Sequence, residues 1–300
     1  MRDLNKHRKI RPKRRLPSWL RQDIPDQEAF NIIRLISKMN VHTVCKEAKC
    51  PNLSNCFKKK ELTFMILGNI CTRNCRFCGV SKSHSKEVLN LDLDEPFRVA
   101  KVARDLGLEY CTITSVSRDD LEDGGASIFA ETVELLRDID KDTKVEVLIP
   151  DFKGSVSSLE CVLSVIPSVV AHNIETVARL YEDLRPMADY RLSLRILHKI
   201  KELIPQMTTK SSIMLGLGET ENEIINTMKD LKDSLCDILT LGQYLSPSPD
   251  HYPVKEFISP EQFENYRSYA VNLGFKKVFA GPLVRSSYLA QQLYQEVVYA

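Results

Sequence analysis

Residues 63–78 read Thr-Phe-Met-Ile-Leu-Gly-Asn-Ile-Cys-Thr-Arg-Asn-Cys-Arg-Phe-Cys, an apolar run followed by three closely spaced cysteines. The run Thr63–Leu67 consists of residues that favour strands, and it ends at a Gly-Asn turn. Cys71, Cys75 and Cys78 follow at once with the spacing C-x3-C-x2-C. Parallel barrels place their chemistry on the loops that follow strands. The stretch therefore predicts a buried strand that delivers three thiols to one functional loop.

Beyond this stretch, short β-rich runs alternate with longer segments of helical period. Strands are predicted at Thr63–Leu67, Tyr110–Val116, Val145–Ile149, Ser168–Ala171, Ser212–Leu215, Ile238–Leu241 and Lys277–Ala280. Repeated strand–helix units imply parallel strands joined by right-handed crossovers. They predict an α/β fold, a partial (β/α)6-type parallel barrel with N-terminal and C-terminal extensions. A doubly wound sheet is the alternative.

Some of the helical segments carry clear boundary signals. Thr220 and Glu223 predict a capping box, and Ser259-Pro260 predicts a second helix start. Two sets of side chains are spaced to share one helix face each: Ile224, Met228, Leu231 and Leu235, and Phe129, Val133, Leu136 and Asp140, the last at a polar edge.

The chain divides into three expected parts. Residues 1–60 form a basic arm and an N-terminal extension, 61–283 form the barrel, and 284–300 form a C-terminal extension. Residues 1–15 hold eight Lys or Arg and one Asp, whereas the whole chain has a net charge of only +2, so the rest is mildly acidic. The arm is either a solvated tail or a segment that attracts an acidic partner electrostatically.

Composition excludes several classes of protein. With 43% hydrophobic and 27% charged residues, the chain is globular and not disordered. No apolar run approaches the roughly 20 residues of a membrane-spanning helix, and no secretory signal is recognisable. The basic arm lacks the interleaved aromatic residues of nucleic-acid binders. We therefore expect a cytoplasmic protein that binds neither nucleic acid nor membrane.

The nine cysteines are the most informative residues, because an odd number in a chain of this size favours reduced thiols over a disulfide framework. Cys45, Cys50 and Cys56, here called the N-terminal trio, are spaced C-x4-C-x5-C; Cys71, Cys75 and Cys78 are the loop trio. A structural zinc site is closed by four ligands. Three thiolates on an iron–sulfur cube leave one iron open to another ligand. Zinc or structural roles stay the alternative, above all for the N-terminal trio. The remaining Cys111, Cys161 and Cys236 are read as small buried hydrophobes.

The loop trio, with an aromatic residue before its last cysteine, resembles the radical S-adenosylmethionine superfamily. The resemblance implies a 4Fe–4S cluster at Cys71, Cys75 and Cys78. It also implies that the open iron binds the amino and carboxylate groups of S-adenosylmethionine, whose reductive cleavage yields a 5′-deoxyadenosyl radical.

From Leu16 to Tyr288 the sequence further resembles the lipoyl synthase family within that superfamily. The resemblance rests on Pro17-Ser18-Trp19-Leu20, on the N-terminal trio with Pro51-Asn52, on 113–126, 146–152, 172–177 and 214–220, and on Arg285-Ser286-Ser287-Tyr288. That last run is here called the C-terminal motif. Asn69, Ser117 and Leu289 depart from the family pattern, but none of them is a predicted cluster ligand.

The resemblance also implies roles for individual residues. The N-terminal trio would hold a second 4Fe–4S cluster with Ser287 as its fourth ligand, and Ser286 is the alternative. Catalytic roles would fall to Cys71, Cys75, Cys78 and Ser287. Contacts to S-adenosylmethionine are expected from Thr114, Ser115, Asn173 and Arg195. Arg185, like Arg195, is a candidate for cofactor or carrier contacts, and His172 is read either as facing the site or as a core residue.

The implied reaction inserts two sulfur atoms, at C6 and C8, into an octanoyl chain on a lysine, with the second cluster as sulfur donor. An unactivated C–H bond calls for radical chemistry, which a cofactor must supply. The implied partners are octanoylated lipoyl-carrier proteins, namely glycine cleavage H protein and lipoyl domains of 2-oxoacid dehydrogenase E2, and an electron donor such as ferredoxin or flavodoxin. A radical methylthiotransferase and a non-enzymatic iron–sulfur or zinc protein are the competing interpretations.

Overall fold

The computed structural model describes residues 16–22, 26–83 and 90–298. Its main sheet has eight strands in the order β1-β2-β5-β6-β7-β8-β9-β10. Their bounds are β1 His42–Thr43, β2 Thr63–Ile66, β5 Tyr110–Ser115, β6 Lys144–Leu148, β7 Val169–Ala171, β8 Thr209–Leu215, β9 Ile238–Gln243 and β10 Lys277–Gly281. The strands from β2 to β10 are parallel, and β1 pairs with β2 in the antiparallel direction. A separate parallel pair joins β3 Ile70–Cys71 to β4 Ser81–Lys82.

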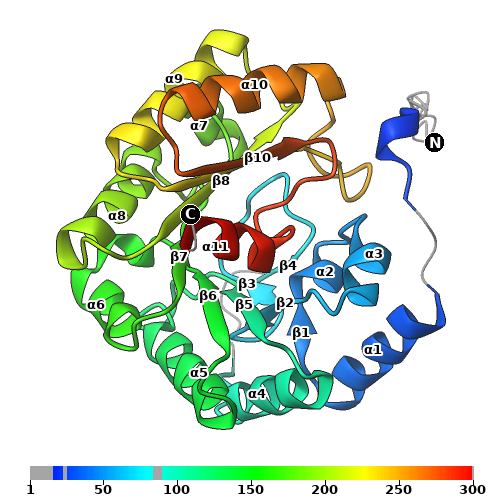
Figure 1. The fold of residues 1–300 in the computed structure, drawn as a ribbon, viewed down its shortest axis with the longest axis vertical. Coiled ribbons are helices and arrows are strands. Elements are labelled where there is room, and N and C mark those ends of the chain that lie inside the picture. Colours follow the sequence, from blue (N-terminus) through cyan, green and yellow to red (C-terminus); the bar gives the residue numbers. More distant parts are fainter. Residues whose placement is uncertain (1–15, 23–25, 84–89, 299–300) are drawn as a thin grey trace, which may run out of the picture.

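The sheet curves around a central space, with most helices on its outside (Figure 1). Parallel strands follow one another in sequence order, without the reversal that a doubly wound sheet requires. The predicted α/β parallel fold is therefore confirmed. β2 and β9 are buried along their whole length, as expected of strands covered on both faces.

Helices connect and extend the barrel. They are α1 Gln27–Lys38, α2 Val44–Glu47, α3 Leu53–Lys58, α4 Glu95–Leu106, α5 Ala126–Ile139, α6 Val156–Ser164, α7 Tyr181–Leu184, α8 Tyr190–Leu203, α9 Glu221–Asp233, α10 Pro260–Asn272 and α11 Ala290–Val298, with 3-10 turns at Ser18–Leu20, Phe152–Gly154 and Ala178–Leu180. No helix in these described stretches is long and apolar enough to span a bilayer.

Side-chain caps explain where several helices begin. Thr220 and Glu223 form the predicted capping box of α9, and the predicted start of α10 is confirmed because Ser259 Oγ accepts from Gln262 N at 3.1 Å. Asp26 caps α1 and Thr43 caps α2 in the same way. These caps satisfy backbone N–H groups that have no partner within the helix.

The apolar helix face predicted to end at Leu235 is wrong for this last residue. Leu235 lies beyond α9, has a φ of 62° and is 47% exposed. Cys236 N donates to Leu231 O at 3.1 Å, so the chain turns toward β9 and carries Leu235 outward. Ile224, Met228 and Leu231 are buried as predicted. Asp140, expected at a polar helix edge, is the C-cap of α5.

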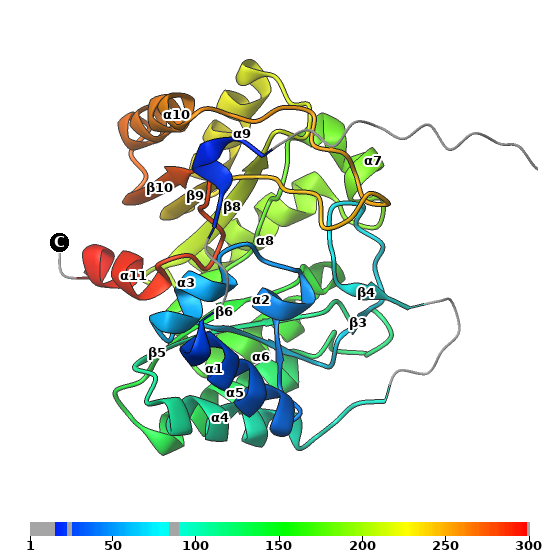
Figure 2. The same ribbon diagram turned by 90° about the vertical axis from the view of Figure 1, so that its right-hand side faces the viewer.

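The two extensions pack on the same side of the barrel. The N-terminal extension supplies α1, β1, α2 and α3, and β1 adds to the sheet beside β2. The C-terminal extension supplies α11, which contacts β10 and lies on the side of the molecule away from the β3–β4 pair in Figure 2. Asn52, next to α3, donates to Leu283 O at the start of this extension. The expected arm at residues 1–15 lies outside the described residues, and the part boundaries at 60 and 283 stay a prediction.

Candidate active site

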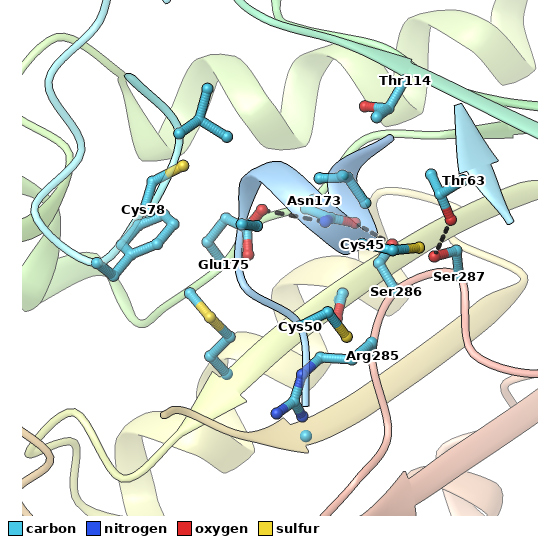
Figure 3. A pocket seen from close by; sticks show the side chains of 18 of the residues that line it. Cys45, Cys50, Thr63, Cys78, Thr114, Asn173, Glu175, Arg285, Ser286 and Ser287 are labelled. Atoms are coloured by element: carbon cyan, nitrogen blue, oxygen red, sulfur yellow. Dashed lines mark hydrogen bonds between the residues drawn. The ribbon is translucent and has the colours of Figure 1, made fainter. Parts of the chain in front are cut away.

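Both cysteine trios line one cavity of about 1280 Å³ that runs through the barrel. The N-terminal trio lies near Thr63, the first residue of β2, whereas the loop trio follows the last residue of the same strand. A strand of this length spans about 10–13 Å, because each residue adds about 3.3 Å. The two trios therefore occupy opposite ends of the cavity. In Figure 3, Cys78 lies on one side and Cys45, Cys50 and Ser287 lie on the other.

Short helices present the N-terminal trio. Cys45 is on α2, Cys56 is on α3, and Cys50 lies in the turn between them, where its N–H donates to Cys45 O at 3.0 Å. Burial, together with the charge of neighbouring thiolates, raises the pKa of the Cys45 and Cys56 thiols to about 12 each. Binding of a metal cluster must therefore displace protons from these thiols.

The loop trio sits on a tightly held turn. Thr72 N donates to Ser117 O at 3.0 Å, and Arg76 N donates to Leu184 O at 2.9 Å, which ties the loop to two neighbouring segments. Burial raises the pKa of the Cys75 thiol and that of Cys78, the latter to about 12. All nine cysteines of the chain are free thiols, so neither trio is used in disulfides.

Arg73, between Cys71 and Cys75, is the main anchor of the loop trio. Its Nε and Nη2 donate to both carboxylate oxygens of Asp119 at 2.7 and 2.9 Å, and its Nη1 and Nη2 donate to those of Asp151 at 2.6 Å each. Burial alone would raise the pKa of Asp151, but Arg73 outweighs it and lowers that pKa to about 2. Asp119 follows β5 and Asp151 follows β6, so Arg73 fixes the loop against the carboxyl ends of two strands.

The C-terminal motif crosses the cavity beside the N-terminal trio. Thr63 Oγ1 donates to Ser287 Oγ at 2.6 Å, and Ser286 Oγ donates to Asn173 Oδ1 at 2.9 Å (Figure 3). Asn52 Nδ2 donates to Leu283 O at 2.5 Å, which joins the trio segment to the start of the motif. Ser287 thus faces the N-terminal trio, whereas Ser286 faces the other way.

Polar groups gather at the ends of β5, β7 and β8. Asn173, Glu175 and Arg185 line the cavity with Thr114 and Ser115. His172 also lines it: its Nδ1 pairs with Ile149 O at 2.9 Å, and burial together with Arg185 lowers its pKa to about 4, so the ring is neutral at physiological pH.

One predicted contact is not brought into the cavity. Arg195 lies on the exposed face of α8, in a separate surface depression with Arg191 and His198. The neighbouring Leu194 and Leu197 are buried and turn Arg195 toward solvent, so the prediction for Arg195 does not fit the structure. Arg185, the other arginine considered, is buried in the cavity wall.

The residues fit the cofactors that the sequence implies. Five buried atoms of cavity-lining residues have no hydrogen-bond partner among the described residues: Asn52 Oδ1, Glu61 Oε2, Ser115 Oγ, His172 Nε2 and Arg185 Nε. Buried polar groups are normally paired, so these atoms indicate a polar ligand. Within the part of the chain that the structure describes, no three Cys, His, Asp or Glu side chains are gathered as around a single metal ion. A four-iron cube holds its ligands on separate irons, farther apart than the four ligands of one zinc ion.

Comparisons with known proteins agree with this geometry. Residues 65–231 match the model of the radical SAM superfamily, and residues 2–50 match the N-terminal domain of lipoyl synthase. A lipoyl synthase of Caldicellulosiruptor bescii is 50% identical over 276 residues, covering 92% of this chain and 94% of that protein. One of Caldanaerobacter subterraneus is 52% identical over 276 residues, covering 92% and 96%. The chain belongs to the lipoyl synthase family. It is a radical S-adenosylmethionine enzyme, and the superfamily implies one 4Fe–4S cluster and S-adenosylmethionine as cofactors.

Solved structures of other proteins resemble the fold of this member of the lipoyl synthase family. HydG, a maturase of the FeFe-hydrogenase, matches with a TM-score of 0.54 at 15% identity over 90% of this chain and 74% of that one. Streptococcus suis SuiB bound to S-adenosylmethionine matches with a TM-score of 0.54 at 11% identity over 76% of this chain and 53% of that one. At such identities the likeness concerns the fold alone.

Sequence reasoning missed several residues of this site. Thr63 was read only as a strand residue, although it contacts Ser287 across 224 positions of sequence. Asp119 and Asp120 were noted only as part of the block 113–126, although they pair with Arg73 and Arg118 respectively. No local spacing links Arg73 to Asp151, so only the fold reveals that pair.

Proposed function

We propose that the enzyme inserts two sulfur atoms, at C6 and C8, into an octanoyl chain carried on a lysine of a carrier protein. The proposal includes a second 4Fe–4S cluster, held by Cys45, Cys50, Cys56 and Ser287, as the source of the sulfur. When bound, the two clusters and S-adenosylmethionine would supply the electron, the radical and the sulfur. The observation that carries the proposal is that two separate thiol trios face each other through one cavity.

The cavity between the trios suits an alkyl chain. Met65, Phe77, Val116, Leu148 and Met214 contribute apolar side chains to its wall. Such a lining excludes water and other hydrogen donors that would quench a radical. It also holds an octanoyl group in place between the cofactor end and the sulfur end, which reduces the entropy cost of the reaction.

Thr63 supports Ser287 as the fourth ligand. Its hydroxyl donates to Ser287 Oγ and also hydrogen bonds to the Cys45 thiol, so one side chain orients two ligands of the N-terminal trio. A ligating serine oxygen accepts hydrogen bonds, and Thr63 Oγ1 is in place to donate one. Oxygen is a harder ligand than thiolate and binds iron–sulfur clusters less well. This makes Ser287 the ligand most easily released when the cluster gives up its sulfur.

At the other end, Arg73 keeps the loop trio in a fixed orientation, and Asn173, Glu175 and Arg185 offer polar contacts to S-adenosylmethionine. We further propose that octanoylated H protein and E2 lipoyl domains are the carriers, that ferredoxin or flavodoxin supplies electrons, and that the enzyme works in the cytoplasm. The basic segment 2–15 would favour an encounter with an acidic carrier.

A product assay tests the proposal. The anaerobically reconstituted enzyme is supplied with S-adenosylmethionine, a reductant and an octanoyl-lysine peptide. Mass spectrometry should detect 5′-deoxyadenosine and a peptide that has gained two sulfur atoms. Cys75→Ala should abolish both products, whereas Cys50→Ala should form 5′-deoxyadenosine without sulfur insertion. Cys161→Ala, on α6 and outside the cavity, is the matched control and should behave as wild type. Sulfur insertion by Cys50→Ala would refute the second cluster as donor.

A further inference from the structure

A short chain of hydrogen bonds links the C-terminal motif to the polar end of the cavity. Ser286 Oγ donates to Asn173 Oδ1 at 2.9 Å, and Asn173 Nδ2 donates to Glu175 Oε1 at 3.0 Å (Figure 3). Ser286 and Asn173 lie 113 positions apart in sequence, so this link depends on how the C-terminal extension is seated. This series of hydrogen bonds connects the segment that carries Ser287 with the cavity wall nearest Cys75.

Glu175 and Ser286, the two ends of this series of hydrogen bonds, differ in how firmly their backbones are held. Glu175 is fixed by its own backbone, because its N–H donates to Ser212 O at 2.9 Å and its carbonyl accepts from Met214 N at 2.8 Å. Ser286 belongs instead to the stretch that links β10 to α11, in which few backbone bonds reach the barrel. Glu175 therefore holds the Asn173 amide in place permanently, whereas the bond from Ser286 is a second restraint that is present only when the C-terminal extension is seated.

The Asn173 amide keeps capacity for a ligand. An amide has two N–H donors and two acceptor lone pairs, and Glu175 and Ser286 each use one. No other described residue bonds to this amide, so one N–H and one lone pair stay available to a molecule in the cavity. If oxygen and nitrogen of the amide exchanged places, Nδ2 could still donate to Ser286 Oγ, but the bond to Glu175 would be lost. Glu175 therefore sets which way the amide faces, and Ser286 restrains its other end.

We propose that Ser286 is a positioning residue that couples the seating of residues 284–298 to the binding of S-adenosylmethionine at Asn173. Ser286 acts through the Asn173 amide and is not a cluster ligand, a role that stays with Ser287. This inference rests on the proposed function in one respect, namely that Asn173 contacts the cofactor.

The coupling works in both directions, because binding free energies are linked. Seating of the C-terminal extension adds the Ser286 bond, which restrains the Asn173 amide and strengthens binding of S-adenosylmethionine. Binding of S-adenosylmethionine in turn stabilises the seated extension. One neutral hydrogen bond sets the scale, so its loss should weaken binding about two- to tenfold.

The test compares three variants as reconstituted enzymes. Ser286→Ala removes the hydroxyl, Ser286→Thr keeps one, and Ser164→Ala removes a hydroxyl on α6 that donates to Cys161 O, remote from the cavity. The Kd of S-adenosylmethionine is measured by equilibrium dialysis, and hydrogen exchange of residues 284–298 is followed with and without S-adenosylmethionine. Iron content is measured for every sample.

Ser286→Ala should bind S-adenosylmethionine about two- to tenfold more weakly, with wild-type iron content, and its C-terminal extension should lose most of the protection that S-adenosylmethionine gives. Ser286→Thr should recover both properties, and Ser164→Ala should match wild type. Unchanged affinity and protection in Ser286→Ala would overturn the proposal. Loss of about four irons in that variant would do so too, because Ser286 would then be the ligand.

The result separates this inference from the proposed function. If wild type forms no lipoyl product but Ser286→Ala still weakens S-adenosylmethionine binding, the proposed reaction fails and the coupling stands. If wild type forms the product and Ser286→Ala binds S-adenosylmethionine normally, the coupling fails and the reaction stands.

Discussion

Replacing Arg73 by methionine should destabilise the fold and loosen the loop that carries the loop trio. The change leaves Asp151, 2% exposed, and Asp119, 17% exposed, without their shared cation. Removing one partner of a buried ion pair costs about 3–5 kcal/mol. The lowered pKa of Asp151 gives a second way to size the stabilisation that Arg73 provides. A shift from 3.8 to about 2 corresponds to about 2.5 kcal/mol for that carboxylate alone. We therefore expect Arg73→Met to lose about 3–4 kcal/mol of unfolding free energy at neutral pH.

The effect should depend on pH in a defined direction. Because the folded pKa of Asp151 is below its unfolded value, its stabilising contribution is present above about pH 4 and disappears as pH falls through about 2. Arg73→Met lacks this contribution at all pH values. The difference between wild type and variant should consequently shrink as the pH falls from 7 toward 3.

Urea unfolding of the metal-free chains, followed by circular dichroism, measures this difference. Arg76→Met is the matched control, because Arg76 lies in the same loop but is 53% exposed and pairs with Asp183, which is 49% exposed. Exposed pairs contribute at most about 1 kcal/mol. Equal stabilities of Arg73→Met and Arg76→Met, or a difference that does not shrink in acid, would refute the reasoning about the Arg73 anchor.

Three further outcomes are expected. Gly242→Ala should displace the C-terminal motif and lower iron content, because a Cβ at Gly242 would overlap the Val284 carbonyl. Limited proteolysis should then cut this variant near residue 284, and resistance equal to that of wild type would contradict the displacement. Thr63→Val should lower iron content at the N-terminal trio while 5′-deoxyadenosine formation persists, and full iron content would contradict the role given to Thr63. Burial raises the pKa of Glu95 to about 7 despite hydrogen bonds from Leu67 and Gly68, so wild type should lose stability as pH rises from 4.5 through about 7. Glu95→Gln should lack that slope in urea unfolding series.

The barrel was predictable because its strands are short apolar runs separated by helical periods. All seven predicted strands are present within a few residues of their expected bounds, and the capping box at Thr220 is confirmed. Such signals are local, since a cap or a strand pattern is written in neighbouring residues. The antiparallel β1, only His42–Thr43, has no such pattern and depends on its pairing with Phe64 and Met65.

Only those parts of the site whose residues lie close together in the sequence could be predicted. Both thiol trios could be recognised from the sequence, because each lies within a dozen residues. The partners of Arg73 and Ser286 could not, because only the closed barrel brings strand ends and the C-terminal extension together. Arg195 shows the opposite failure: the resemblance implied a contact to the cofactor, but Leu194 and Leu197 occupy the inner face of its helix and Arg195 faces away from the cavity.

The central claim is that this chain holds two iron–sulfur clusters, one for each trio of thiols. Iron counting after anaerobic reconstitution tests it most directly, on wild type and on a variant with Cys45, Cys50 and Cys56 all replaced by alanine. We predict about eight irons per chain for wild type and about four for the variant, with the S-adenosylmethionine-dependent spectrum of the remaining cluster retained. About four irons in wild type, or an iron content that the triple replacement does not change, would contradict the account.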